Sequence, residues 1–144
     1  MIRDAVPPDA AALCELLTQL GYPASVNEVA VRLAHVRRRS RVVVAADAQD
    51  TPAGLIVLAT IDALEHDLPL CMVVALVVRD SDRRRGVGAE LLAEAERWAV
   101  DQGCGRVVLG TADHRTDAIR FYRSHGYQET GLRFVKPLSA STSR

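Results

Sequence analysis

The sequence of 144 residues lacks any apolar run of the roughly 18 residues needed to cross a bilayer, and its start lacks the charged-then-apolar pattern of a signal peptide. Aromatic residues make up only 4% of the chain, and the formal net charge is zero. The sequence therefore offers neither a stacking platform nor an overall attraction for nucleic acid. We expect a cytoplasmic protein with no membrane partner and no nucleic-acid partner.

Cysteine is also scarce, because only Cys14, Cys71 and Cys104 occur, an odd number at wide spacings. This pattern fits reduced thiols in apolar segments better than a set of disulfides. No pair of histidines has the spacing of metal ligands, and we expect no metal site.

Apolar residues make up 49% of the sequence, enough for one sizeable core. We expect a single domain over 1–138, followed by a polar tail over 139–144 that frays.

The spacing of apolar residues predicts an alternation of helices and strands. Helical spacing, with capping and stop residues, predicts helices at about 8–20, from 25 to about 36, from 87 to 103 and at about 116–125. β-branched and apolar runs predict strands at 2–5, 41–46, 54–61, 70–78, 106–110 and 132–138. The run at 70–78 is almost continuously apolar, so we expect a central strand buried on both faces. The strand, helix and strand from 70 to 110 predict a parallel pair joined by a right-handed crossover.

The turn Arg83-Arg-Arg-Gly-Val-Gly88 joins an apolar strand to an amphipathic helix. A helix N-terminus has unpaired amides and the positive end of the helix dipole, and glycines leave room for an anion to approach the backbone. The turn therefore predicts a pyrophosphate site. The sequence has no Gly-Lys-Ser/Thr, which excludes a Walker-type loop. The one Gly-x-Gly of this turn, Gly86-Val-Gly88, falls short of the Gly-x-Gly-x-x-Gly of a dinucleotide-binding turn.

Two segments resemble the signatures of the GNAT superfamily of acyl-CoA-dependent N-acyltransferases. Arg83-Arg-Arg-Gly-Val-Gly88 fits the pattern Arg/Gln-x-x-Gly-x-Gly/Ala, and Ala118-Ile-Arg-Phe-Tyr-Arg-Ser-His-Gly-Tyr127 resembles the second signature in the same order. The resemblance implies an α+β fold, an α/β/α sandwich with a mixed, strongly twisted central sheet, splayed parallel strands and flanking helices.

The resemblance also implies acetyl-CoA as co-substrate. Its pantetheine arm would follow the main chain at 76–78, and its pyrophosphate would lie on the amides from about 84 to 89. Where Arg115 stands, members of the family often carry asparagine. The residues implied to bind the cofactor are Leu76, Val77, Val78, Arg83, Arg84, Arg85, Gly86, Val87, Gly88, Ala89, Arg115, Ala118, Phe121 and Tyr122.

Acyl transfer to an amine needs a proton for the departing thiolate and a base for the amine. The resemblance implies Tyr122 as the general acid. Many members carry a carboxylate in the strand before the turn, but 71–78 contains none. Base candidates are the loop residues Glu65, His66, Asp67, Asp113 and His114, of which we name His114.

We therefore expect an N-acetyltransferase that moves an acetyl group from acetyl-CoA to a primary amine of a small molecule, peptide or protein. Neither signature contains a cysteine to carry the acyl group, which favours direct transfer in a ternary complex. A catalytically silent acyl-CoA-binding regulatory module is the alternative. Members of the family often pair, and a homodimer is expected.

Overall fold

The computed structural model describes residues 1–111 and 116–138. It divides into two compact units, Met1–Leu109 and Gly110–Arg144, and each is described by itself. The single domain over 1–138 stays a prediction, and the tail over 139–144 lies outside the described residues.

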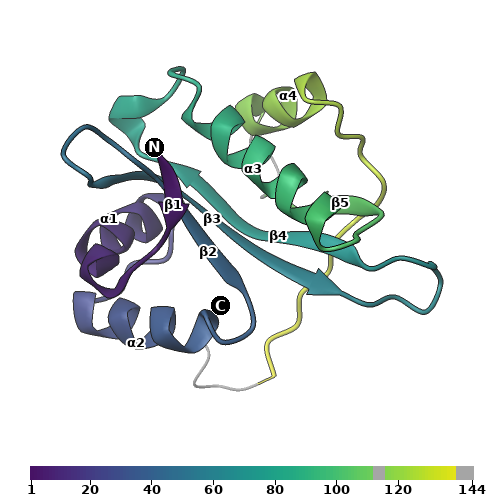
Figure 1. The fold of residues 1–144 in the computed structure, drawn as a ribbon, viewed down its shortest axis with the longest axis horizontal. Helices are drawn as coiled ribbons and strands as arrows, with labels where there is room; N and C mark the ends of the chain where they lie inside the picture. Colours follow the sequence, from purple (N-terminus) through teal and green to yellow (C-terminus); the bar gives the residue numbers. More distant parts are fainter. Residues whose placement is uncertain (112–115, 139–144) are drawn as a thin grey trace. The chain divides into compact units, whose positions relative to one another are not determined.

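The first unit is built on one mixed sheet of five strands in the order β1-β2-β3-β4-β5 (Figure 1). β1 to β4 pair antiparallel, and β5 runs parallel to β4. The strands are β1 (Ile2–Asp4), β2 (Arg41–Ala46), β3 (Pro52–Ile61), β4 (Leu70–Val78) and β5 (Arg106–Leu109). This arrangement confirms the predicted mixed sheet and its parallel pair.

The helices begin and end largely where local signals place them. Ser25 caps its helix through a reciprocal capping box with Glu28, and Gly21 ends the preceding one with a φ of 107°. The first helix starts later than predicted, because residues 7–9 form a separate 3-10 turn. The helices of the first unit are α1 (Ala10–Leu20), α2 (Val26–Val36) and α3 (Val87–Asp101), with 3-10 turns η1 (Pro7–Asp9) and η2 (Asp80–Asp82); α4 (Thr116–Ser124) belongs to the second unit.

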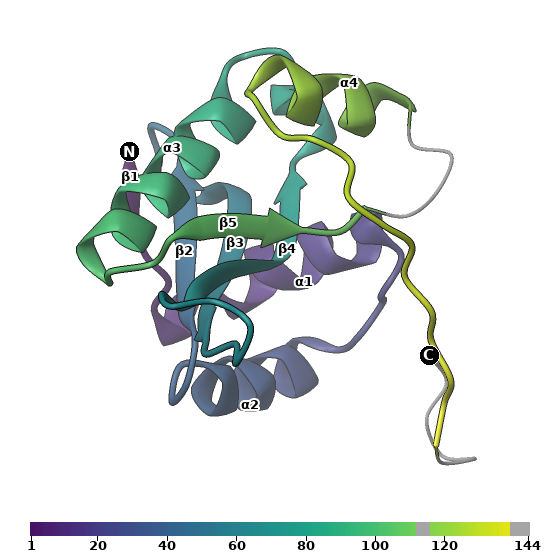
Figure 2. The same ribbon diagram turned by 90° about the vertical axis from the view of Figure 1, so that its right-hand side faces the viewer.

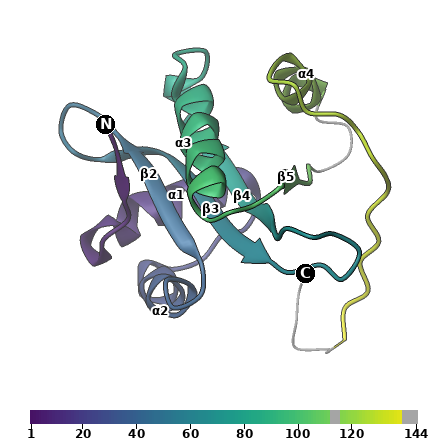
Figure 3. The same cartoon turned by 45° about the vertical axis from the view of Figure 1, so that its right-hand side comes forward.

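Helices cover both faces of the sheet, with α1 and α2 on one side and α3 on the other (Figures 2 and 3). Val42 and Val44 of β2 lie in the core beneath α1 and α2. Val43 and Ala45 alternate with them and are buried on the opposite face, which α3 covers. The α/β/α layering thus explains why this strand is apolar at nearly every position.

β4 is not buried on both faces, contrary to the prediction. The pairing register shifts between Val57 and Leu58, and Val74 is left without a partner as the extra residue of a bulge. Its side chain is 60% exposed. Among the described strands, β4 lies next to the edge of the sheet rather than at its centre, with β5 beyond it.

The strand predicted at 132–138 does not form. These described residues pair with no other described strand, and Leu132, Phe134 and Leu138 are 86%, 89% and 92% exposed. A β-strand needs a neighbour to satisfy its main-chain N–H and C=O groups, so an alternating apolar pattern alone does not make one.

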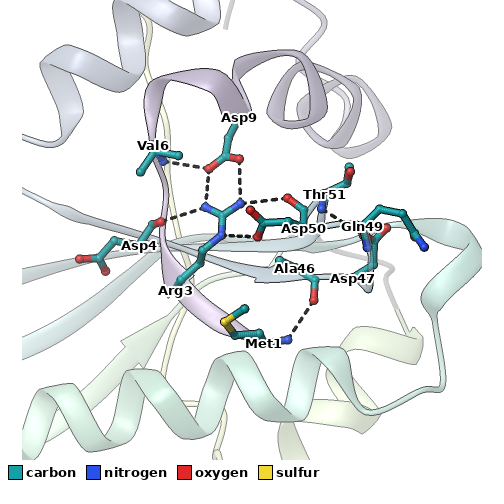
Figure 4. Close-up of polar contacts among 10 residues, drawn as sticks. All are labelled: Met1, Arg3, Asp4, Val6, Asp9, Ala46, Asp47, Gln49, Asp50 and Thr51. Atoms are coloured by element: carbon teal, nitrogen blue, oxygen red, sulfur yellow. Dashed lines mark hydrogen bonds and ion pairs between the residues drawn. The ribbon is translucent and has the colours of Figure 1, made fainter.

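An ion-pair network fixes the start of the chain to the β2–β3 turn (Figure 4). The Arg3 guanidinium donates to both carboxylate oxygens of Asp9 at 2.8 and 3.0 Å, and its Nε donates to Asp50 at 2.9 Å. Asp9 is buried, with 5% of its surface exposed. Burial by itself would raise the pKa of this carboxyl, but hydrogen bonds from Arg3 and the Val6 N–H outweigh burial and hold the pKa below its usual range.

Replacing Asp9 with Asn should lower the free energy of unfolding at pH 7 by about 2 kcal/mol, because it leaves the Arg3 guanidinium without its buried partner. A depressed folded-state pKa stabilises the fold above the unfolded pKa of about 3.9, and this stabilisation is lost as the pH falls through the folded value. Urea unfolding of both proteins from pH 7 to pH 3 should therefore show the difference shrinking below about pH 4. A difference that stayed constant over that range would contradict the role given to this carboxylate.

Candidate functional site

β4 has one free edge along its second half. Its parallel pairing with β5 runs from Leu70↔Arg106 to Val73↔Leu109 and goes no further. Beyond that point 75–78 pair with β3 alone, so no described strand occupies the other edge. The main chain of Leu76, Val77 and Val78, predicted to hold a cofactor, lies on this part of the strand. One of its groups is engaged, because the Val78 C=O accepts a hydrogen bond from Gln19 at 2.6 Å.

The turn after β4 exposes a run of backbone amides. Arg84 has a φ of 67° and Gly86 a φ of 83°, and left-handed residues of this kind turn successive N–H groups into one concave surface. The first helical hydrogen bond of α3 joins the Glu90 N–H to the Gly86 C=O. The N–H groups of 84–89 donate to no other residue within the described ranges. They include Arg85, Val87, Gly88 and Ala89, so the structure brings the predicted amides together at one helix start.

The arginines around the turn differ in how they are engaged. Arg79 donates from Nε to Asp82 at 2.6 Å and from Nη2 to Asp47 at 3.1 Å. Arg83 pairs with Asp80 at 3.1 Å and is 58% exposed. For Arg84 and Arg85, both exposed, the structure shows no ion pair with any described residue. The charge available to an incoming anion therefore lies at the tip of the turn.

Gly54 lets the start of α3 approach the sheet closely. A Cβ at this position in β3 would lie 2.8 Å from Cγ1 of Val87 and 3.0 Å from Cδ1 of Leu91. Gly54 also pairs with Val78, the last residue of β4. The absence of a side chain here thus sets where the exposed amides stand relative to the end of the strand.

In the second unit, Tyr122 lies on α4 and is partly buried. Its ring meets that of Phe121 edge-on, with centroids 5.4 Å apart, and that of Tyr127 at 6.2 Å. Its C=O accepts from the N–H groups of His125 and Tyr127 at the end of the helix. Ala118 lies one turn earlier and is partly buried.

The base candidates fall into two groups. Asp113 and His114, with the cofactor candidate Arg115, lie outside the described residues. Glu65, His66 and Asp67 lie exposed in the β3–β4 loop, which is at the opposite end of β4 from the turn. The His66 ring nitrogen Nε2 contacts the Arg106 guanidinium.

Sequence reasoning missed three side chains that shape the turn. Gln19 of α1 donates to the Val78 C=O at the end of β4. Arg79, directly after β4, donates to Asp47 of the β2–β3 turn and to Asp82 of the turn after β4. Among the described residues, no group of three or more His, Cys, Asp or Glu side chains could hold a metal ion.

A sequence model described as the Acetyltransferase (GNAT) family matches residues 11–127. The chain belongs to the GNAT acetyltransferase family. It is also 33% identical over 129 residues to an aminoalkylphosphonate N-acetyltransferase from Salmonella typhimurium, covering 89% of this chain and 82% of that protein.

Solved structures of GNAT proteins share the fold. A GNAT family acetyltransferase from Staphylococcus aureus superposes with a TM-score of 0.82 at 22% identity, covering 96% of this chain and 98% of that one. An aminoglycoside N-acetyltransferase in complex with CoA gives 0.79 at 19% identity, covering 97% and 100%.

The family confirms the predicted activity and co-substrate. This GNAT protein is an N-acetyltransferase that takes an acetyl group from acetyl-CoA and passes it to an amine. The α+β fold is confirmed as well. None of the helices in the described ranges is long and apolar enough to span a bilayer.

Proposed function

We propose that the amides of 84–89 bind the pyrophosphate of acetyl-CoA and that the free edge of β4 at 76–78 binds its pantetheine arm. The observation that carries this proposal is the run of N–H groups with no described partner, directly after a strand with one open edge. Unpaired helix N-terminal amides and the helix dipole suit a diphosphate, and an extended amide-bearing arm suits an open strand edge. Arg84 and Arg85 add charge-assisted contacts, and Arg83 flanks them.

Replacing both Arg84 and Arg85 with Gln should raise the Kd for coenzyme A about tenfold, because two exposed charges at the turn are removed while the amides stay. Calorimetry of coenzyme A binding measures this change. The control is Arg37→Gln with Arg38→Gln, which removes two exposed arginines at the end of α2. Equal losses in both double variants would contradict the proposed site.

Chemistry at the thioester needs a proton donor for sulfur, and we assign this role to Tyr122. The support is its place in the second signature and its partly buried phenol in an aromatic cluster with Phe121 and Tyr127. The amine attacks the thioester carbonyl in a ternary complex, the C–S bond breaks, and the thiolate takes the phenolic proton. Phe121 and Ala118 contribute apolar contacts to the cofactor, Arg115 contributes a charged one, and His114 is proposed as the base.

Tyr122→Phe should lower kcat by about 100-fold and leave the KM for acetyl-CoA within about twofold, because only the proton donor is lost. Steady-state rates of thiol release measure both constants. Tyr127→Phe removes a hydroxyl from the neighbouring ring of the same cluster and should retain normal turnover. If the two variants had the same kcat, Tyr122 would have no special role as an acid.

We further propose that the acceptor is a primary amine on a small polar molecule. The support is the 33% identity to a protein named for aminoalkylphosphonate acetylation, over 89% of this chain. We place the reaction in the cytoplasm, which suits the free thiols of Cys14, Cys71 and Cys104.

We also propose that the protein is a homodimer in which a second copy covers the segment 132–138. Leu132, Phe134 and Leu138 of this segment are almost fully exposed, and Val135 between them is 66% exposed. Exposed apolar side chains that lie close together on one short segment mark an interaction surface. The main chain of 132–138 pairs with no described strand and can pair with a strand of a second copy.

Phe134→Asp should convert the dimer into a monomer, because a charge would be buried in the contact. Light scattering after size-exclusion chromatography measures the mass. Val31→Asp replaces another exposed apolar residue, 71% exposed on α2, and should leave the dimer intact. A wild-type protein that is monomeric at micromolar concentration would contradict this assembly.

A further inference from the structure

Arg79 stands between the end of β4 and the turn that carries the exposed amides. Its guanidinium donates to two carboxylates, Asp82 at 2.6 Å and Asp47 at 3.1 Å. The main-chain N–H of Arg79 donates to the Ala53 C=O at 2.7 Å. The three side chains are 33%, 15% and 22% exposed. The residue therefore ties the turn after β4 to the turn between β2 and β3.

This engagement makes Arg79 unsuitable as a phosphate ligand. One cation lies between two anions, so the group of three carries a net negative charge that would repel a diphosphate. Binding phosphate through this guanidinium would also require breaking two charge-assisted hydrogen bonds. Arg84 and Arg85 make no ion pair with a described residue, although Arg85 is near enough to Asp82 to lower the pKa of that carboxyl.

Asp47 is itself held in place. Its Oδ1 accepts from the N–H groups of Gln49 and Thr51 at 2.9 and 3.0 Å, and this leaves Oδ2 for Arg79 (Figure 4 shows the loop contacts). The carboxylate is thus a fixed acceptor on the β2–β3 turn rather than a swinging side chain.

Gln19 of α1 provides a second anchor on the same junction. Its Nε2 donates to the Val78 C=O at 2.6 Å, and its Oε1 accepts from the Asp80 N–H at 2.9 Å. One carboxamide therefore fixes the main chain on both sides of Arg79, as a paired strand would.

The turn needs these anchors because part of it is strained. Arg84 has a φ of 67°, in a region of backbone conformation that residues other than glycine and asparagine adopt at a cost in free energy. Such a conformation persists only where the surroundings fix the chain on both sides. Gln19 and Arg79 fix the strand side, and the close packing of Val87 over Gly54 fixes the helix side.

We propose that Arg79, Asp47 and Gln19 are positioning residues for acetyl-CoA. They touch no atom of the co-substrate and act on it only through the shape of the turn that presents the amides of 84–89. This inference rests on the proposed pyrophosphate site. It predicts that loss of Asp47 or Arg79 weakens binding of the nucleotide half of acetyl-CoA and leaves binding of the thioester half unchanged.

The test compares two acetyl donors, acetyl-CoA and S-acetylpantetheine, which lacks the pyrophosphate and the nucleotide. Asp47→Asn keeps an acceptor for the Gln49 and Thr51 N–H groups but removes the charge facing Arg79. We expect its KM for acetyl-CoA to rise about tenfold, with kcat and the KM for S-acetylpantetheine within about twofold of wild type. Arg79→Met should show the same split, and the double variant of Asp47→Asn with Arg79→Met should lose no more than either single one. Gln19→Leu also releases the Val78 C=O on the proposed pantetheine edge, so its KM should rise for both donors.

Asp50→Asn is the matched control, because it changes the same kind of carboxylate in the same loop but one that pairs with Arg3. It should leave the KM for both donors unchanged. Thermal unfolding checks that each variant folds. If Arg79→Met does not fold, Asp47→Asn, which is the smaller change, carries the test. For Asp47→Asn, equal losses with both donors, or an unchanged KM for acetyl-CoA, would overturn the inference. Failure of wild-type protein to prefer acetyl-CoA over S-acetylpantetheine would instead overturn the pyrophosphate site itself.

Discussion

The proposed acetyl-CoA site depends on how β4 ends. A bulge at Val74 and the end of the β5 ladder at Val73↔Leu109 leave the last residues of β4 paired on one side only. Bulges increase the twist of a strand, and a strand free on one edge can accept an extended ligand. The chain then leaves β4 through a turn that is fixed on the strand side by side-chain hydrogen bonds and on the helix side by the contact of Gly54 with α3. The open edge and the exposed amides are therefore consequences of one junction.

The parts of this junction that the sequence predicts are those with local causes. β4 has the predicted bounds because its apolar run begins after Pro69 and ends before Arg79. α2 begins directly after its N-cap Ser25, because its capping box lies within four residues. The amides before α3 follow from a glycine that precedes an amphipathic helix, since every helix start has unpaired N–H groups. These signals need no knowledge of distant residues, and each was readable from a short stretch of chain.

The parts that escape the sequence depend on distant partners. Gln19 and Asp80 are 61 residues apart and Asp47 and Arg79 are 32 apart, so neither contact leaves a periodic trace. The only signal for Gln19 is a carboxamide at the end of an apolar helix, which is equally typical of a solvent-facing position. Dependence on distant partners also explains two wrong predictions. Val74 is exposed because the register of β4 with β3 shifts beside it. Residues 132–138 form no strand because no described strand pairs with them.

For one step of the reaction, removal of the proton from the amine, the described residues offer no well-placed base. An amine with a pKa near that of lysine is neutral at pH 7 only at a cost of about 4 to 5 kcal/mol. β4 carries no carboxylate, and its 9 residues put the loop holding Glu65 and Asp67 roughly 30 Å from the turn. His66 is also poorly suited as the base. A guanidinium can only donate hydrogen bonds, so the contact with Arg106 occupies Nε2 of His66 as the acceptor. A water relay, or His114 outside the described residues, therefore stays our proposed route for this proton.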